Sequence, residues 1–108
     1  ITEVLSDVIG SSSSLDGKAI QSFISGQFNI NVEELNSRNR KRSVSFPRQI
    51  AMYLTRKYTD ASLADIGKLY NRDHSTVLHA IRVVTMDMSR NSSIKDQVSI
   101  LCNKLQNR

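Results

Sequence analysis

The chain has 108 residues, which suffices for one domain with a single core and is too short for two. Four glycines and one proline are few turn-forming residues for this length, so the composition disfavours sandwiches and barrels and favours long helices. The longest apolar run has five residues, Ile50–Leu54, whereas a membrane span needs roughly twenty, so we expect no contact with the membrane interior.

Two features concern the cellular setting. The one cysteine, Cys102, has no cysteine partner for a disulfide or a zinc site, which suits a reducing cytoplasm, and its place on an apolar stripe predicts a small core residue. The chain begins at Ile1 rather than at Met and has no signal-peptide core, so we expect a cytoplasmic piece of a longer protein.

The net charge of +5 is unevenly distributed. Residues 1–37 hold one base and five acids, whereas residues 38–82 hold ten bases and three acids. Within this block, residues 38–57 include seven bases and no acid. Such a field attracts a polyanion, either nucleic acid or an anionic membrane surface. The plainer alternative is a solvated charged face.

The first elements are a terminal segment and a capped helix. Residues 1–9 have apolar side chains at helical spacing and are followed by a glycine and four serines at 10–14, which is typical of a preceding segment that ends in a flexible join. Asp16 is the predicted N-cap of a helix that reaches Phe28.

The middle of the chain has three expected elements. Asn31, three residues before Glu34, predicts a short turn of helix through Leu35, and the polar run 38–42 predicts a loop. Pro47 suits the first turn of a helix, where its missing N–H costs nothing. The polar side of this helix is expected to present Arg48, Gln49 and Arg56.

Three more helices complete the pattern. Ser62 with Asp65 predicts a capping box before a short helix of about nine residues, and Gly67 inside that helix fits a close approach of another backbone. Asp73 is the predicted N-cap of a longer amphipathic helix, and Ser93 that of the last one. The sequence therefore predicts a compact all-α domain of about five to six helices.

A short helix, a turn of three or four residues and a longer helix together form a helix-turn-helix, whose second helix enters the major groove of DNA with its N-terminus first. The start of the longer helix combines hydrogen-bond donors, acceptors and a methyl group, as reading of base edges requires. These side chains are Arg72, Asp73, His74, Ser75, Thr76 and His79.

Two runs of sequence resemble one family. Residues 66–80, which include Arg-Asp-His-Ser-Thr-Val at 72–77, resemble the signature of the C-terminal DNA-binding domain (domain IV) of the bacterial replication initiator DnaA family. Residues 40–52 resemble the family's basic loop and the helix after it. The resemblance covers roughly residues 18–106 and implies a helix-turn-helix DNA-binding domain at 18–108, with residues 1–17 as the end of an ATPase domain and its linker.

The resemblance also implies a ligand. The family binds as a monomer to an asymmetric box, 5′-TTATNCACA-3′, in double-stranded DNA at the replication origin, which places the protein at the nucleoid. By matching position, the major-groove residues would be Arg56, Leu63, Ala64, Asp73, His74, Ser75, Thr76 and His79. Arg40 would reach the minor groove. Contacts to phosphates or support of the loop would come from Lys41, Arg42, Arg48, Gln49 and Arg72.

The residues also suggest two functions other than DNA reading, catalysis and docking. The ATP-binding motifs are absent, so ATP is expected only in the missing ATPase domain and no cofactor is expected here. Asp73 and His74 could belong to a nuclease, but no catalytic triad accompanies them and Asp73 is needed as a cap, so we expect no enzyme. His74 and His79 are about 140° apart around a helix and cannot share a metal. A third reading is a docking module whose basic face meets anionic lipid or an acidic protein.

Overall fold

The computed structural model describes residues 16–107, and in this part of the chain all regular structure is helical. The six helices are α2 (Gly17–Phe28), α3 (Val32–Leu35), α4 (Arg42–Tyr58), α5 (Leu63–Tyr70), α6 (His74–Arg90) and α7 (Ser92–Gln106). The predicted all-α class is therefore confirmed. The segment expected at residues 1–14 lies outside the described residues, so the domain boundary at residue 17 stays a prediction.

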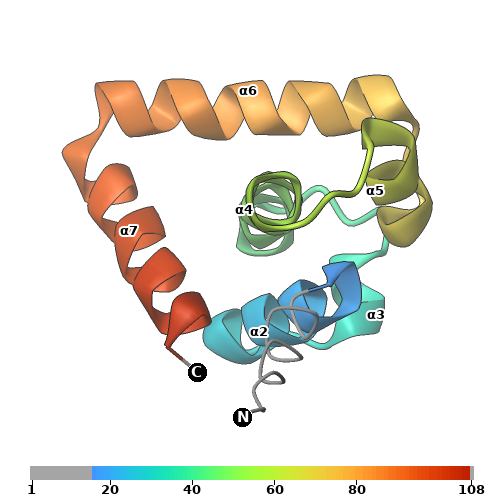
Figure 1. Ribbon diagram of the computed structural model, residues 1–108, viewed down its shortest axis with the longest axis horizontal. Helices are drawn as coiled ribbons and strands as arrows, with labels where there is room; N and C mark the ends of the chain where they lie inside the picture. The colour runs from blue at the N-terminus through green and yellow to red at the C-terminus, as the bar shows by residue number, and fades with distance from the viewer. Residues whose placement is uncertain (1–15, 108) are drawn as a thin grey trace, which may run out of the picture.

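Helix α4 is the centre of the fold. Figure 1 shows it end-on, with α6 above it, α7 and α5 at the two sides and α2 below. Each helix turns one apolar stripe towards this centre and thereby removes it from water. The buried apolar side chains that make up this core cluster are Ile20, Ile24, Leu35, Ile50, Ala51, Met52, Leu54, Ile66, Tyr70, Val77, Ala80, Val84, Val98, Leu101 and Leu105. Cys102 is half-buried and packs against this core.

Four helices begin at the caps that the sequence predicts. At α3, the Asn31 side chain accepts from the Glu34 N–H at 2.7 Å. Asp16 accepts a hydrogen bond from the Ala19 N–H at 2.8 Å. Ser62 and Asp65 form a reciprocal capping box at the start of α5. Asp73 accepts from the Thr76 N–H at 2.9 Å and so caps α6. These bonds satisfy N–H groups that have no partner inside a helix.

The predicted start of α4 is wrong. We expected Pro47 in the first turn, but the helix begins at Arg42, and Pro47 is buried inside it. The additional turn buries Val44 to 2% exposure and sets the Phe46 ring edge-on against Phe28, with the centroids 6.2 Å apart. These apolar contacts outweigh the one backbone hydrogen bond that proline cannot make.

The predicted cap of α7 is also wrong. Asn91, not Ser93, caps the helix, and its side chain accepts from the Ser93 N–H at 3.0 Å. Asn91 is at the same time the residue that ends α6, where its N–H donates to the Asp87 carbonyl. A single residue therefore forms the corner between the two helices.

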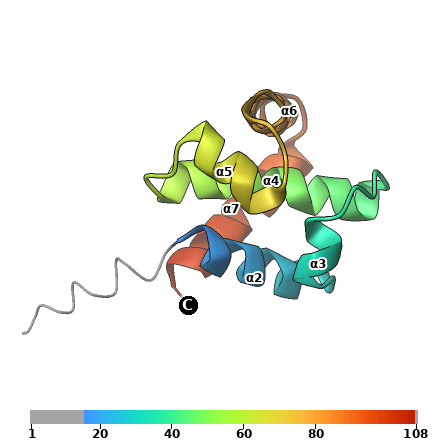
Figure 2. The ribbon, with the colours of Figure 1, turned by 90° about the vertical axis from the view of Figure 1, so that its right-hand side faces the viewer.

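Helices α5 and α6 form the predicted helix-turn-helix, with only Asn71, Arg72 and Asp73 between them. Asn71 has the left-handed conformation, with a φ angle of 57°, which turns the chain sharply. Figure 2 looks along α6 from its N-terminal end, with α5 on one side and the segment leading into α4 on the other. No helix in the described part of the chain is long and apolar enough to cross a membrane.

Candidate nucleic-acid interface

The first turn of α6 presents polar side chains to solvent. His74, Ser75 and Thr76 are exposed, and His79 is exposed one turn later. Val77 and Ala80 are buried in the core, and they fix the rotation of the helix about its axis. Because Val77 and Ala80 pack into the core, the polar side chains at the start of α6 face solvent, next to the turn that follows α5.

Asp73 carries both a structural bond and a free acceptor. Its Oδ1 accepts from the Thr76 N–H and, at 3.1 Å, from the Ser75 hydroxyl. The Thr76 hydroxyl, then the Thr76 N–H and the Ser75 hydroxyl, and last the nearby His74 hold the pKa of this carboxyl below its usual value. The bonds from the Thr76 N–H and the Ser75 hydroxyl both use Oδ1, and a carboxylate with about four lone-pair sites can accept further hydrogen bonds.

The basic loop that precedes α4 is held by short-range hydrogen bonds. The Ser37 hydroxyl donates to the Glu34 carbonyl, the Asn39 N–H donates to the Ser37 hydroxyl, and the Lys41 N–H donates to the Asn39 side chain. Arg40 lies between the last two residues and is exposed. The loop therefore presents Arg40 from a backbone that is anchored on both sides.

Arg48 does not lie on the outer face of α4, where we expected it. It is 7% exposed, and its guanidinium donates to the carbonyls of Leu35, Ser37 and Asn39 at 2.7 to 2.9 Å. Burial, and next the charge of Arg72, lower its pKa. A buried cation needs such partners, so these contacts fit support of the basic loop, one of the two roles expected for Arg48; its contact with phosphate stays a prediction.

Arg72 links the turn to the same loop. Its Nη1 donates to the Tyr70 and Asn71 carbonyls and its Nη2 to the Ser37 carbonyl. Burial lowers its pKa, and so do the charges of Arg38 and Arg40. The structure thus gathers cationic groups from the loop beside the start of α6.

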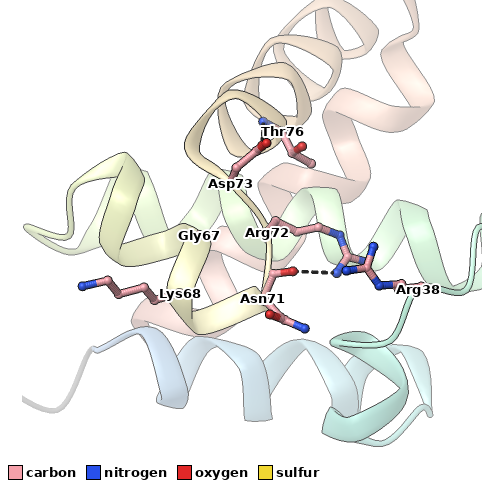
Figure 3. Close-up of a pocket in the computed structure, with 7 residues that line it drawn as sticks. All are labelled: Arg38, Gly67, Lys68, Asn71, Arg72, Asp73 and Thr76. Atoms are coloured by element: carbon pink, nitrogen blue, oxygen red, sulfur yellow. Dashed lines mark hydrogen bonds between the residues drawn. The ribbon is translucent and has the colours of Figure 1, made fainter.

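An open hollow of about 490 Å³ lies between the loop, α5 and the start of α6, and it is lined by Arg38, Gly67, Lys68, Asn71, Arg72, Asp73 and Thr76. Figure 3 shows the guanidinium groups of Arg38 and Arg72 close together, whereas Lys68 extends the opposite way. Arg38 and Lys68 are missing from the predicted site. The sequence signal for Arg38 is its position in the basic run 38–42, and the signal for Lys68 is its position on the exposed face of α5.

The remaining predicted residues lie around this centre. Arg56 is exposed and donates to the Ala61 carbonyl just before α5, where Ala64 is exposed and Leu63 half-buried. Lys41 and Arg42 are exposed at the start of α4, with the Arg42 guanidinium 4.6 Å from the centre of the Phe46 ring. Gln49 is half-buried and lines a small cavity between α4 and α6 together with His79.

Comparison with known families decides the relationship. A family model described as bacterial dnaA protein helix-turn-helix matches residues 18–84. The chain belongs to the bacterial DnaA helix-turn-helix family. The resemblance noted in the sequence is thereby confirmed. Because a helix-turn-helix of this family is a binding module, the prediction that the chain is not an enzyme is confirmed as well.

Several DnaA proteins are similar over most of this chain. The chromosomal replication initiator protein DnaA of Desulfotalea psychrophila is 50% identical over 98% of the chain, and that of Desulfatibacillum aliphaticivorans is 38% identical over 96%. A crystal structure described as a DNA replication initiation factor superimposes with a TM-score of 0.75 at 33% identity, covering 91% of this chain and 30% of that one. The chain spans only 22% and 23% of the two DnaA proteins.

Proposed function

We propose that this domain is the sequence-specific DNA-binding module of a cytoplasmic, nucleoid-associated replication initiator, and that it binds TTATNCACA-like boxes in double-stranded DNA at the origin. The observation that carries the proposal is the exposed polar start of α6, which lies directly beside a loop rich in arginine. Neither ATP nor a metal has a part in this binding.

The start of α6 is the proposed reader of the major groove. His74, Thr76 and His79 offer ring nitrogens, a hydroxyl and a methyl group, and Asp73 offers the remaining acceptor sites of its carboxylate. A carboxylate in the major groove accepts from the amino groups of cytosine or adenine, whereas a methyl group packs on thymine. Arg56, Leu63, Ala64 and Ser75 extend this surface towards the start of α5.

Arg40 is the proposed reader of the minor groove. The AT-rich half of the box favours a narrow minor groove, whose strong negative potential attracts an arginine. Lys41, Arg42, Gln49 and Arg72 would contact the phosphates on either side, and Arg38 and Lys68 add charge at the hollow. Phosphate contacts set position and affinity, whereas the two readers set sequence.

The test is fluorescence anisotropy with a labelled TTATNCACA duplex, a scrambled duplex of equal composition and vesicles containing anionic lipid. We expect the box to bind at least about a thousandfold more tightly than the scrambled duplex at physiological salt. With roughly four to six phosphate contacts, the slope of log K against log salt should be about −4 to −5. Because the box is asymmetric, sedimentation should show one chain per box. Equal affinity for the two duplexes, or preference for vesicles, would reject the proposal.

A further inference from the structure

The carbonyl oxygen of Ser37 is shared by two arginines from different parts of the chain. Arg48 Nη2 donates to it from α4 at 2.8 Å, and Arg72 Nη2 donates to it from the turn of the helix-turn-helix. Ser37 lies three residues before Arg40, inside the segment that presents this side chain. The loop and the turn are therefore joined at one atom, although 35 residues separate them.

Arg72 is suited to act as a rigid link because its guanidinium donates hydrogen bonds to the turn and to the basic loop at the same time. Nη1 donates to the carbonyls of Tyr70 and Asn71, and the Arg72 N–H donates to the Gly67 carbonyl at 2.7 Å. These bonds fix the guanidinium to the turn, and Nη2 then reaches the loop. The two terminal nitrogens of a planar guanidinium donate to the turn and to the loop in a fixed geometry, whereas a lysine has a single nitrogen on a flexible stem and no such fork.

The positive charges around Arg72 would destabilise the contact between the turn and the loop if the carbonyl acceptors of Arg72 were absent. Arg38 and Arg40 lie close enough to lower the pKa of Arg72, and Arg48 meets the same carbonyl. Like charges repel, so the loop would move away from the turn if only the charges acted. The carbonyls hold the two elements together against this repulsion.

We propose that Arg72 is a positioning residue that fixes the Arg40 loop relative to α6. Arg40 and the start of α6 can then contact the minor and the major groove of the same box at the same time. This inference rests on the proposed function and deepens it. Asp73, the cap of α6, directly follows Arg72, so a shift of the loop relative to Arg72 changes the distance between the two readers. Arg72 thus contributes to specificity for the AT-rich half of the box without touching a base.

The test is a double-mutant cycle of Arg40→Ala and Arg72→Lys, measured by anisotropy on the box and on a box whose AT-rich half is replaced by GC pairs. Arg72→Lys keeps the charge for phosphates but removes the fork. We expect it to lower the preference for the AT-rich half roughly tenfold, about as much as Arg40→Ala, since a positioned arginine contact is worth this much. The double variant should equal Arg40→Ala within about twofold, because Arg72 acts through Arg40.

The control is Arg90→Lys, an exposed arginine change at the far end of α6, which should leave the preference unchanged. Amide hydrogen exchange of the free proteins is measured without DNA, and there Arg72→Lys should speed exchange at Asn39 and Lys41 whereas Arg90→Lys should not. The proposal is overturned if Arg72→Lys weakens both duplexes by one factor, if the two effects multiply, or if exchange is unchanged. A wild-type chain that binds box and scrambled duplex alike would instead reject the proposed function, and this inference with it.

Discussion

Gly67 in α5 faces the backbone carbonyl of Arg72 so closely that a methyl group at residue 67 would collide with the carbonyl oxygen. The same two residues are joined by the hydrogen bond from the Arg72 N–H to the Gly67 carbonyl. The absence of a side chain in α5 therefore sets how tightly the turn folds back. It thereby sets where α6 begins relative to α5.

This contact predicts the effect of Gly67→Ala. A colliding methyl group should move the turn and lower the free energy of unfolding by about 1 to 3 kcal/mol, with some loss of preference for the box. The matched control is Gly26→Ala in α2, where an added methyl group meets nothing within 4 Å and should raise stability by about 0.5 to 1 kcal/mol. Urea denaturation of both variants measures this difference, and equal changes would contradict the role of Gly67.

His74→Ala tests the reader on α6. We expect the affinity for the box to fall about 5- to 150-fold and the affinity for a scrambled duplex to stay the same, because a base contact carries about 1 to 3 kcal/mol of discrimination. Anisotropy with the two duplexes measures this. Arg90→Ala, an exposed change at the far end of the same helix, is the control and should alter neither. An equal loss on both duplexes would make His74 a phosphate contact.

Arg48→Met tests the buried guanidinium. The apolar stem is kept, but the bonds to three loop carbonyls are lost. The free energy of unfolding should fall by about 1.5 to 3 kcal/mol, and binding of the box should suffer more than binding of a scrambled duplex. Lys41→Ala removes an exposed charge that makes no side-chain cap, and should change stability by less than about 0.5 kcal/mol. Unchanged stability of Arg48→Met would contradict the loop-supporting role.

The cap of α6 predicts a dependence on pH. Because the pKa of Asp73 is lower in the folded protein than its ordinary value of 3.8, the charged carboxylate stabilises the fold above that value. The contribution is lost as pH falls through the lowered pKa. Asp73→Asn keeps a capping oxygen without titrating, so the stability difference between wild type and variant should shrink on acidification below pH 3.8. A difference that stays constant or grows would contradict this assignment.

The sequence predicts the helices well where the signal is local. The caps Asp16, Ser62 and Asp73 bind N–H groups three residues ahead, so spacing alone identifies them. Pro47 misleads because its local rule is outweighed by the contact of Phe46 with Phe28, a residue from another helix.

The site is predictable to the same degree. The polar start of α6 follows from the capped amphipathic pattern, and the exposed residues there were all expected. The sequence places Arg48 on the surface because charged side chains in a basic run are usually exposed to solvent, whereas in the structure Arg48 is buried. Its acceptors are main-chain carbonyls 9 to 13 residues away, and no side-chain pattern reveals them.

The most direct test of the central claim is a map of amide chemical-shift changes when the TTATNCACA duplex is added to the ¹⁵N-labelled chain. The account predicts the largest changes at residues 74–79 and 38–41, with α7 nearly unaffected because it lies away from the turn (Figure 1). With a scrambled duplex, the changes at residues 74–79 should be much smaller. Changes concentrated on α7, or the same map with both duplexes, would contradict the claim that α6 and the Arg40 loop read the box.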